Sequence, residues 1–411
     1  MSDLKVEIDP TEAGFDPDRL ARIDAHFASY VDDGRLPGWL VLVSRGGRVV
    51  HLSTCGQRDK EAGLPVEVDT LFRVYSMTKP VTSVAAMMLY EEGAFELKDE
   101  VSRFIPAFAD MRVYRSGSHM NAVTGPATEP VRIWHLLTHT SGLTYGFHHA
   151  HPVDAMYRAA GFEWGTPPKQ DLAACCEVLG SLPLLFQPGA EWNYSMSTDV
   201  LGRVVEVASG TTLDRFFEER IFEPLGMTDT AFSAPASDHE RLAALYGAAP
   251  RTRRAVRLDA MGDAAKKQPT YLSGGGGLVS TAADYHRFTQ MLRGAGTLDG
   301  VRLLGPRTLR YMTRNHLPGG TDLEHFGRPL FAETTFDGVG FGLGFSVLAD
   351  PAANRVLSTA GEFGWGGAAS TVFWVDPVED VTAIFLTQLL PSSTHPIRSQ
   401  LRQLVYQALV D

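Results

Sequence analysis

Residues 71–93, LFRVYSMTKPVTSVAAMMLYEEG, carry the patterns of a strand, a turn and a helix in immediate succession. Residues 71–74 are apolar and β-branched enough for a short buried strand. After the turn, apolar residues recur at steps of three and four from Val81 to Leu89, which predicts a helix. Pro80 fits the first turn of that helix, where its missing N–H costs nothing, and Gly93 suits its end.

This arrangement predicts that Ser76 lies at a helix N-terminus, with Lys79 one turn further on the same face. A serine hydroxyl becomes a good nucleophile only when a base takes its proton, and a lysine three residues on can reach it. For that role the Lys79 amine must be neutral, which burial or nearby positive potential favours. The helix N-terminus supplies such potential and also stabilises negative charge on Ser76. The alternative is a helix-capping serine followed by an ordinary surface lysine.

The composition is typical of a soluble globular protein. The chain has 411 residues, of which 44% are hydrophobic and 21% are charged, and this length suffices for two or three cores of domain size. The net charge of −11 argues against nucleic acid and anionic membrane surfaces as partners. No apolar run approaches the roughly 18 residues of a membrane span, and the first fifteen residues lack the features of a signal peptide.

Cysteine and histidine usage gives no sign of a metal site. Cys55, Cys175 and Cys176 have neither disulfide nor metal-binding spacing, so we expect free thiols in a reducing compartment, the cytoplasm. The histidines at 148, 149 and 151 cluster near Asp154, but the segment has loop composition, and a metal site needs ligands fixed by an element. We expect a solvated loop there, no metal and no cofactor.

Strand patterns lie near the two ends of the chain, and helical patterns fill the middle. Between about residues 94 and 265, short helical patterns alternate with loops rich in proline and glycine. The segments expected to form strands are residues 39–45, 48–53, 341–349, 368–375 and 381–389.

This order predicts an α/β fold with one sheet built from both chain ends and an inserted, mostly helical domain. We assign residues 1–75 and 270–411 to the sheet domain. Residues 76–269 form the mostly helical domain, which carries the Ser76 helix and a loop around Tyr194. Clefts between domains are preferred ligand sites, and the Ser76 helix begins at the first boundary.

Two further stretches carry candidate chemistry. Residues 192–196, WNYSM, form a loop exposing Tyr194, and a tyrosine near a lysine can relay a proton because positive charge favours its ionised form. The alternative is a half-buried tyrosine packed on Trp192. Residues 361–368, GEFGWGGA, lead into a strand, and their backbone N–H groups could bind an oxyanion if they face Ser76. The alternative is a β-turn with a packed tryptophan.

Together, Ser76-x-x-Lys79, the Tyr194 loop and the late glycine-rich stretch resemble the serine β-lactamase and penicillin-binding-protein superfamily, which carries the Ser-x-x-Lys signature. More closely, the chain resembles class C β-lactamases and, closest, the family VIII carboxylesterases that share their fold. Residues 136–143, LLTHTSGL, are also a common stretch in these proteins. The resemblance spans nearly the whole chain and implies an antiparallel sheet flanked by helices.

The resemblance also implies roles for individual residues. Ser76 would be the nucleophile, Lys79 its proton acceptor and Tyr194 the general base or acid. The backbone N–H groups of Ser76 and of Ala368 or Gly367 would form the oxyanion hole.

Two departures from the class C pattern bear on the substrate. Met196 stands where the lactamases carry an asparagine that contacts the antibiotic's amide side chain. Trp365-Gly366-Gly367 stands where they carry Lys-Thr-Gly, whose lysine helps to bind the substrate carboxylate, and a tryptophan supplies no positive charge. Trp-Gly-Gly is itself similar to family VIII esterases. We therefore expect Trp365, Gly366, Met196 and Tyr145, the last in a loop that shapes the acyl pocket, to contact a neutral ester.

The leading hypothesis is a serine carboxylesterase that hydrolyses a small-molecule ester through an acyl-enzyme on Ser76. Short acyl chains are what the resemblance implies, and no residue indicates them. The alternatives are acyl transfer to a metabolite alcohol or amine, a weak β-lactamase or amide hydrolase activity, and a sensor module that acylates once. The sequence leaves the oligomeric state unknown.

Overall fold

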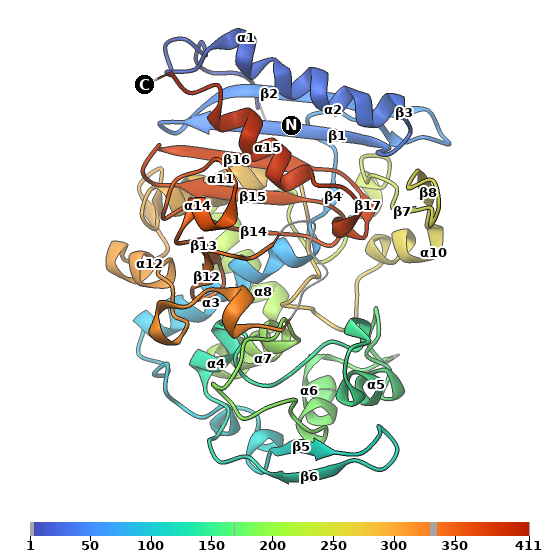
Figure 1. Ribbon diagram of the computed structural model, residues 1–411, viewed down its shortest axis with the longest axis vertical. Helices are drawn as coiled ribbons and strands as arrows, with labels where there is room; N and C mark the ends of the chain where they lie inside the picture. The colour runs from blue at the N-terminus through green and yellow to red at the C-terminus, as the bar shows by residue number, and fades with distance from the viewer. Residues whose placement is uncertain (1–3, 168, 329–334, 411) are drawn as a thin grey trace.

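The structure, a computed structural model, describes residues 4–167, 169–328 and 335–410 (Figure 1). Among these residues, an antiparallel sheet of eight strands organises the fold, and strands from the N-terminal part pair with strands from the C-terminal part. In spatial order the strands are β12 (Val339–Phe341), β13 (Ser346–Leu348), β14 (Phe363–Gly366), β15 (Val372–Asp376), β16 (Val381–Leu386), β1 (Gly38–Arg45), β2 (Arg48–Asp59) and β3 (Leu64–Pro65). The predicted antiparallel sheet from both chain ends is confirmed.

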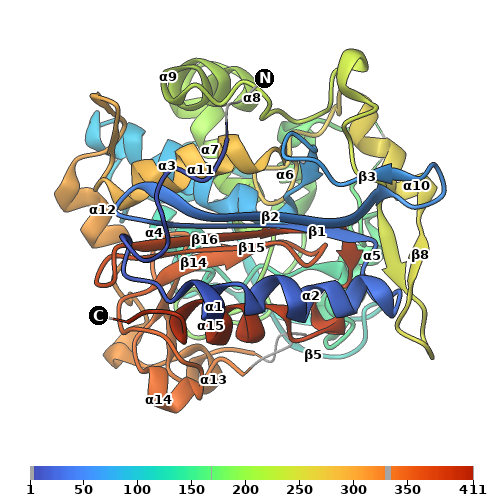
Figure 2. The ribbon, with the colours of Figure 1, turned by 90° about the horizontal axis from the view of Figure 1, so that it is seen from above.

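The two faces of the sheet bury different hydrophobic clusters. In β1, Trp39 and Val41 face one cluster, whereas Leu40 and Leu42 face the other. Successive side chains of a strand point to opposite faces, so a strand covered on both sides is apolar without interruption. The helices α2 (Arg22–Asp32) and α15 (Ile397–Tyr406) lie on the first face and α11 (Ala282–Arg293) lies on the second (Figure 2).

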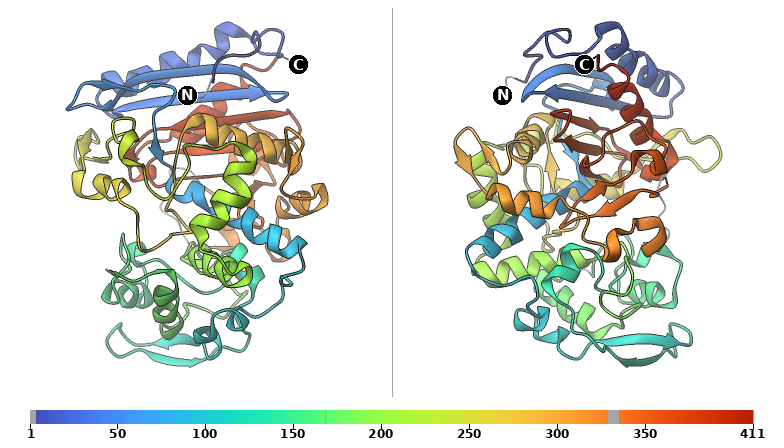
Figure 3. Two further views of the ribbon diagram at one scale, coloured as in Figure 1. Left: turned by 180° about the vertical axis from the view of Figure 1, so that it is seen from behind. Right: turned by 60° about the vertical axis from the view of Figure 1, so that its left-hand side comes forward.

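Beyond the second face lies the helical region that contains the candidate site. Its centre is α3 (Thr78–Glu91), in which every residue from Thr78 to Leu89 is buried. A helix that is buried all round needs packing partners on every side. The other helices of this region come from the middle of the chain (Figure 1 and Figure 3); they include α4 (Ile133–Leu137), α5 (Pro152–Ala159), α6 (Leu172–Ser181), α7 (Ser197–Ser209) and α8 (Leu213–Phe217), of which α7 and α8 pack on α3.

The middle of the chain, expected to be mostly helical, also contains short strands that the sequence did not indicate. The strands β5 (Arg112–Ser116) and β6 (Val123–Pro126) form a hairpin, and β7 (Tyr246–Ala248) pairs with β8 (Ala255–Arg257) and with β17 (Leu389–Leu390). These strands are short and mostly exposed or half-buried, so the apolar alternation that would reveal them is missing. The domain boundaries after residues 75 and 269 stay a prediction.

Two strand positions near the C-terminus also differ from the prediction. Residues 341–349 are not one strand but the turn between β12 and β13 with its flanks. The strand expected at 368–375 begins only at Val372, and Phe363–Gly366, expected in a loop, are the strand β14. A Cβ on Gly364 would overlap the backbone of β15, so this strand requires the glycine that made it look like a loop.

Within the described residues, no helix combines the length and the apolar character that crossing a membrane requires.

Phe385 tests the core beneath α2, where its ring centroid lies 4.9 Å from that of Phe27 and 6.3 Å from that of Trp39. We expect Phe385→Ala to lower the free energy of unfolding by about 3–5 kcal/mol, because it leaves a cavity in place of a buried ring. Urea unfolding measures this change. Val378→Ala, at a side chain that is 65% exposed, is the control and should change it by less than about 0.5 kcal/mol. Equal losses in the two variants would contradict this description of the core.

Candidate active site

Ser76 lies in a 3₁₀ turn, Tyr75–Met77, directly before α3. The chain reaches this turn through β4 (Phe72–Arg73), which pairs with β9 (Val279–Ser280). Tyr75 has a φ of 44°, a left-handed conformation that residues other than glycine adopt rarely and at a free-energy cost. The predicted strand, turn and helix are therefore present, and the strained turn sets Ser76 at the helix N-terminus.

The Lys79 side chain is buried beside Ser76, and the residue is only 2% exposed. Its Nζ lies 3.3 Å from Ser76 Oγ, 3.0 Å from the Tyr145 hydroxyl and 2.6 Å from the carbonyl oxygen of Gly275. A carbonyl oxygen can only accept a hydrogen bond, so one N–H of Lys79 points at Gly275. These contacts exclude the alternative of an ordinary surface lysine.

Tyr194 contacts Lys79 with the face of its ring. The Lys79 Nζ lies 4.5 Å from the ring centroid, while the Tyr194 hydroxyl accepts the indole N–H of Trp365 at 3.4 Å. The Tyr194 carbonyl accepts a hydrogen bond from His148 Nε2 at 2.7 Å. Tyr194 is thus in place beside the lysine, but its hydroxyl is bonded to the opposite wall.

Tyr145, expected only to contact the substrate, is the tyrosine whose hydroxyl meets the lysine. Burial and the charges of Asp199 and Tyr194 raise the pKa of Tyr145 well above its ordinary value, so this hydroxyl keeps its proton at neutral pH. Sequence reasoning missed the contact with Lys79. The available signal was the position of Tyr145, two residues after LLTHTSGL.

His139, within the stretch LLTHTSGL, packs against the Tyr194 loop. Its ring centroid lies 5.1 Å from that of Tyr194, and its Nδ1 lies 3.2 Å from Ser195 Oγ. Burial lowers the pKa of His139 well below its ordinary value. The imidazole is therefore neutral at neutral pH and holds the loop without adding charge beside Lys79.

The end of β14 supplies the second candidate oxyanion donor. The Gly367 N–H donates to the Thr371 carbonyl oxygen at 2.9 Å, which leaves it unavailable to a substrate. No hydrogen bond of the Ala368 N–H occurs among the described residues, and Ala368 lines the same pocket as Ser76. A Cβ on Gly367 would collide with the Val74 carbonyl, so glycine is needed where β14 approaches the Ser76 turn. Of the two expected donors, the geometry favours Ala368 over Gly367.

Ser76, Tyr145, Tyr194 and Ala368 line a pocket with a volume of about 610 Å³. Stacked rings lead outward from the lysine: the Tyr145 and Phe147 centroids are 4.5 Å apart, and the Phe147 and Trp164 centroids are 4.6 Å apart. Trp164 is 53% exposed and forms the rim. The expected substrate-binding residues Trp365, Gly366, Met196 and Tyr145 all belong to the lining.

The wall beside Trp365 also carries a cation that the sequence did not reveal. Arg398 of α15 lines the pocket, and its Nη2 donates to the carbonyl oxygens of Gly367 at 3.0 Å and Thr371 at 3.3 Å. A Cβ on Gly366 would overlap the guanidinium. Because Gly366 has no side chain, the positively charged Arg398 guanidinium can lie directly against β14.

The histidine cluster expected to be a loop has separate structural contacts. His148 holds the Tyr194 carbonyl, His149 lies 3.5 Å from Glu163, and His151 Nδ1 accepts the N–H of Val153 at the start of α5. These contacts point in different directions.

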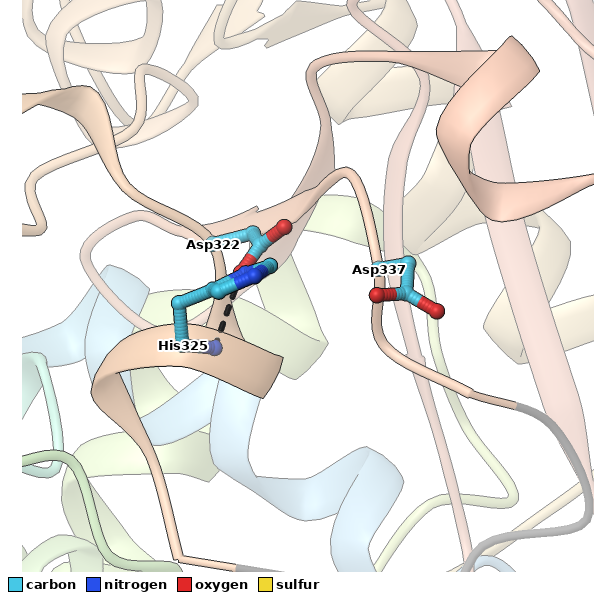
Figure 4. Close-up of side chains that lie close together, drawn as sticks. All are labelled: Asp322, His325 and Asp337. Carbon is cyan, nitrogen blue, oxygen red and sulfur yellow. Dashed lines mark hydrogen bonds and ion pairs between the residues drawn. The ribbon is translucent and has the colours of Figure 1, made fainter.

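A different group, Asp322, His325 and Asp337, could reach one ion within the part of the chain that the structure describes (Figure 4). Asp322 precedes α13 (Leu323–Phe326) and accepts the His325 N–H at 3.0 Å, His325 Nδ1 at 2.6 Å and the Gly338 N–H at 2.9 Å. These hydrogen bonds account for Asp322 as a helix cap and a loop tether.

The chain is similar to known proteins over most of its length. A family model described as beta-lactamase matches residues 23–407. Protein Rv1367c of Mycobacterium tuberculosis is 39% identical over 88% of each chain. Esterase EstB of Burkholderia gladioli is 32% identical, over 97% of this chain and 98% of its own. The solved structure of EstCE1, described as a hydrolase with promiscuous acyltransferase activity, has a TM-score of 0.79 at 29% identity and covers 95% of this chain and 99% of its own.

The role of the Ala368 amide can be tested by removing its N–H. We expect Ala368→Pro to lower kcat about 10²–10³-fold, because proline has no N–H and one oxyanion donor is lost. Ala368→Gly keeps the N–H and should stay within a few-fold of wild type. Steady-state kinetics with p-nitrophenyl acetate measure both, with circular dichroism to check folding. A folded proline variant with wild-type kcat would rule out this donor.

Proposed function

The chain belongs to the beta-lactamase family and is a serine hydrolase, and we propose that it is a carboxylesterase that hydrolyses short-chain esters through an acyl-enzyme on Ser76. The observation that carries the proposal is the buried Lys79 amine, 3.3 Å from Ser76 Oγ, beside a pocket that Ser76 lines together with several aromatic rings. The name of the relative EstB, an esterase, supports the choice of an ester substrate.

In the proposed first half-reaction, Ser76 Oγ attacks the ester carbonyl carbon while its proton passes to the neutral Lys79 amine. The carbonyl oxygen becomes an oxyanion, which the N–H groups of Ser76 and Ala368 stabilise; losing one such donor typically costs about 2.7–4 kcal/mol. The intermediate then collapses, and the alcohol leaves with the proton, which comes from Lys79 directly or through the hydroxyl of Tyr145 or Tyr194. Water repeats these steps on the acyl-enzyme and releases the acid.

The aromatic part of the pocket lining favours a neutral substrate. The rings of Tyr145, Phe147 and Trp164 offer apolar faces. Trp365 presents an uncharged indole at the position where the resemblance to class C β-lactamases implies a lysine. Arg398 is directed at backbone carbonyls of the wall. We propose a small-molecule ester as the partner, and neither nucleic acid nor a membrane, since the net charge is −11. The free cysteines support the cytoplasm as the location.

Acyl transfer is the second candidate, favoured by the description of EstCE1 as a hydrolase with promiscuous acyltransferase activity. The acyl-enzyme and its formation are common to both reactions. They differ only in whether water or a bound alcohol or amine removes the acyl group.

A burst experiment tests the acyl-enzyme. With p-nitrophenyl acetate and butyrate, we expect a burst of about one equivalent, an acyl adduct on Ser76 by intact mass and continued turnover, because acylation and deacylation are separate steps. Ser76→Ala should lose nearly all turnover and the adduct. Ser237→Ala, at an exposed serine outside the pocket lining, is the matched control and should behave as wild type.

The same experiment separates hydrolysis from transfer when alcohols are added as acceptors. Free acid as the main product supports the esterase, whereas transfer product in excess of free acid would favour the transferase. Equal rates in wild type and Ser76→Ala, without an adduct, would overturn the proposed chemistry altogether.

Tyrosine variants test which hydroxyl moves the proton. We expect Tyr145→Phe to lower kcat by about 10²-fold, because a positioned proton-transfer group typically contributes at least that much and the Tyr145 hydroxyl is 3.0 Å from Lys79 Nζ. Tyr194→Phe should cause a loss of similar size if its hydroxyl turns to the reacting atoms when substrate binds. Tyr271→Phe is the control, since Tyr271 lines the pocket and its hydroxyl has no partner among the described residues. An unchanged kcat in Tyr145→Phe would mean that Tyr145 lines the pocket but transfers no proton.

A further inference from the structure

We infer that Asp199 is a positioning residue for the catalytic lysine: it holds the Gly275 carbonyl that turns the Lys79 amine toward Ser76. This inference rests on the proposed function of Ser76 and Lys79. Asp199 is the third residue of α7 and is 2% exposed. It follows the Tyr194 loop in the sequence, so a single segment delivers both residues to the site.

The Asp199 carboxylate binds the start of the glycine-rich segment 273–278. Its Oδ1 accepts the Ser273 hydroxyl at 2.6 Å and the Gly275 N–H at 3.1 Å. A Cβ on Gly275 would overlap Asp199 Oδ2, so the carboxylate lies directly against this peptide. Buried carboxylates that accept such hydrogen bonds hold their partners firmly, because breaking the bond leaves a charge unsatisfied.

The same segment is tied to α3, the helix that carries Lys79. Thr82 Oγ1 donates to the Gly274 carbonyl oxygen at 2.7 Å, and the Leu278 N–H donates to Thr78 Oγ1 at 3.1 Å. Asp199 of α7 thus fixes one side of the segment and two threonines of α3 fix the other. The Gly275 carbonyl has a defined position relative to Lys79 only while both sides hold.

The Gly275 carbonyl matters because it determines which way the N–H groups and the lone pair of the Lys79 amine point. A neutral lysine amine has two N–H donors and one lone pair. The Gly275 oxygen at 2.6 Å engages one N–H and the Tyr145 hydroxyl at 3.0 Å can engage the other, so the lone pair is left to face Ser76 Oγ. A carboxylate orients the histidine base of a Ser-His-Asp triad in the same sense. Here a carbonyl orients the base, and the carboxylate of Asp199 positions the carbonyl.

The test compares Asp199→Ala with Asp199→Asn in stopped-flow acylation by p-nitrophenyl acetate. We expect Asp199→Ala to lower the acylation rate constant and kcat tenfold or more, with KM within threefold of wild type and a burst near one equivalent. Asp199→Asn should stay within about threefold of wild type, because its amide oxygen can still accept the bonds from Ser273 and Gly275. Asp171→Ala is the control, since Asp171 caps α6 through the Ala174 N–H and should leave the acylation rate constant unchanged.

Other results would overturn the inference without touching the esterase proposal, which depends on Ser76→Ala. A smaller burst with an unchanged rate constant would mean that Asp199 only stabilises the fold. An Asn variant as slow as the Ala variant would mean that charge, not the bond to Gly275, is what matters. A raised KM with unchanged kcat would make Asp199 a substrate contact. If Asp199→Ala does not fold, Gly275→Ala displaces the same peptide, and wild-type acylation in that variant would equally overturn the inference.

Discussion

The structure of the site depends on the burial of one amine. Lys79 is 2% exposed, and a buried amine is destabilising unless its polar groups find partners. The partners are the Gly275 carbonyl, the Tyr145 hydroxyl and Ser76 Oγ, with the Tyr194 ring 4.5 Å away. They come from separate parts of the sequence, so the arrangement exists only when the sheet and the surrounding helices are packed around α3.

Glycines mark the places where this packing is closest, and each is needed for a different neighbour. At Gly275 a side chain would overlap the Asp199 carboxylate, at Gly367 the Val74 carbonyl, and at Gly366 the Arg398 guanidinium. Each contact aligns one component of the site. These components are the Gly275 carbonyl beside Lys79, the end of β14 beside Ser76, and the Arg398 guanidinium beside the pocket wall. The glycines of this pocket serve close approach of the chain, because a Cβ would separate the elements.

Local sequence patterns encode part of the site. The sequence predicts Ser76 and Lys79 because a strand, a turn and a periodic helix surround them within one short segment. The strand β14 was missed because its glycines lower strand propensity, and what they gain is tertiary contact with β15 and α15. The contact of Tyr145 with Lys79, 66 residues apart, leaves no periodic signal at all. The preference for Ala368 over Gly367 depends on one hydrogen bond to Thr371, which only the folded chain reveals.

Trp365, at the position where the resemblance to class C β-lactamases implies a lysine, affects more than the charge of the pocket. The Trp365 indole donates to the Tyr194 hydroxyl, so this hydroxyl is tied to the pocket wall while its ring covers the lysine. A second hydroxyl, that of Tyr145, meets the lysine instead. Under the proposed mechanism two tyrosines therefore share the role of proton transfer. Tyr145 stays hydrogen-bonded to Lys79, and Tyr194 lies between Lys79 and the pocket wall that contacts the substrate. Trp365, which favours neutral esters, thus also determines where the proton-carrying tyrosine hydroxyls lie.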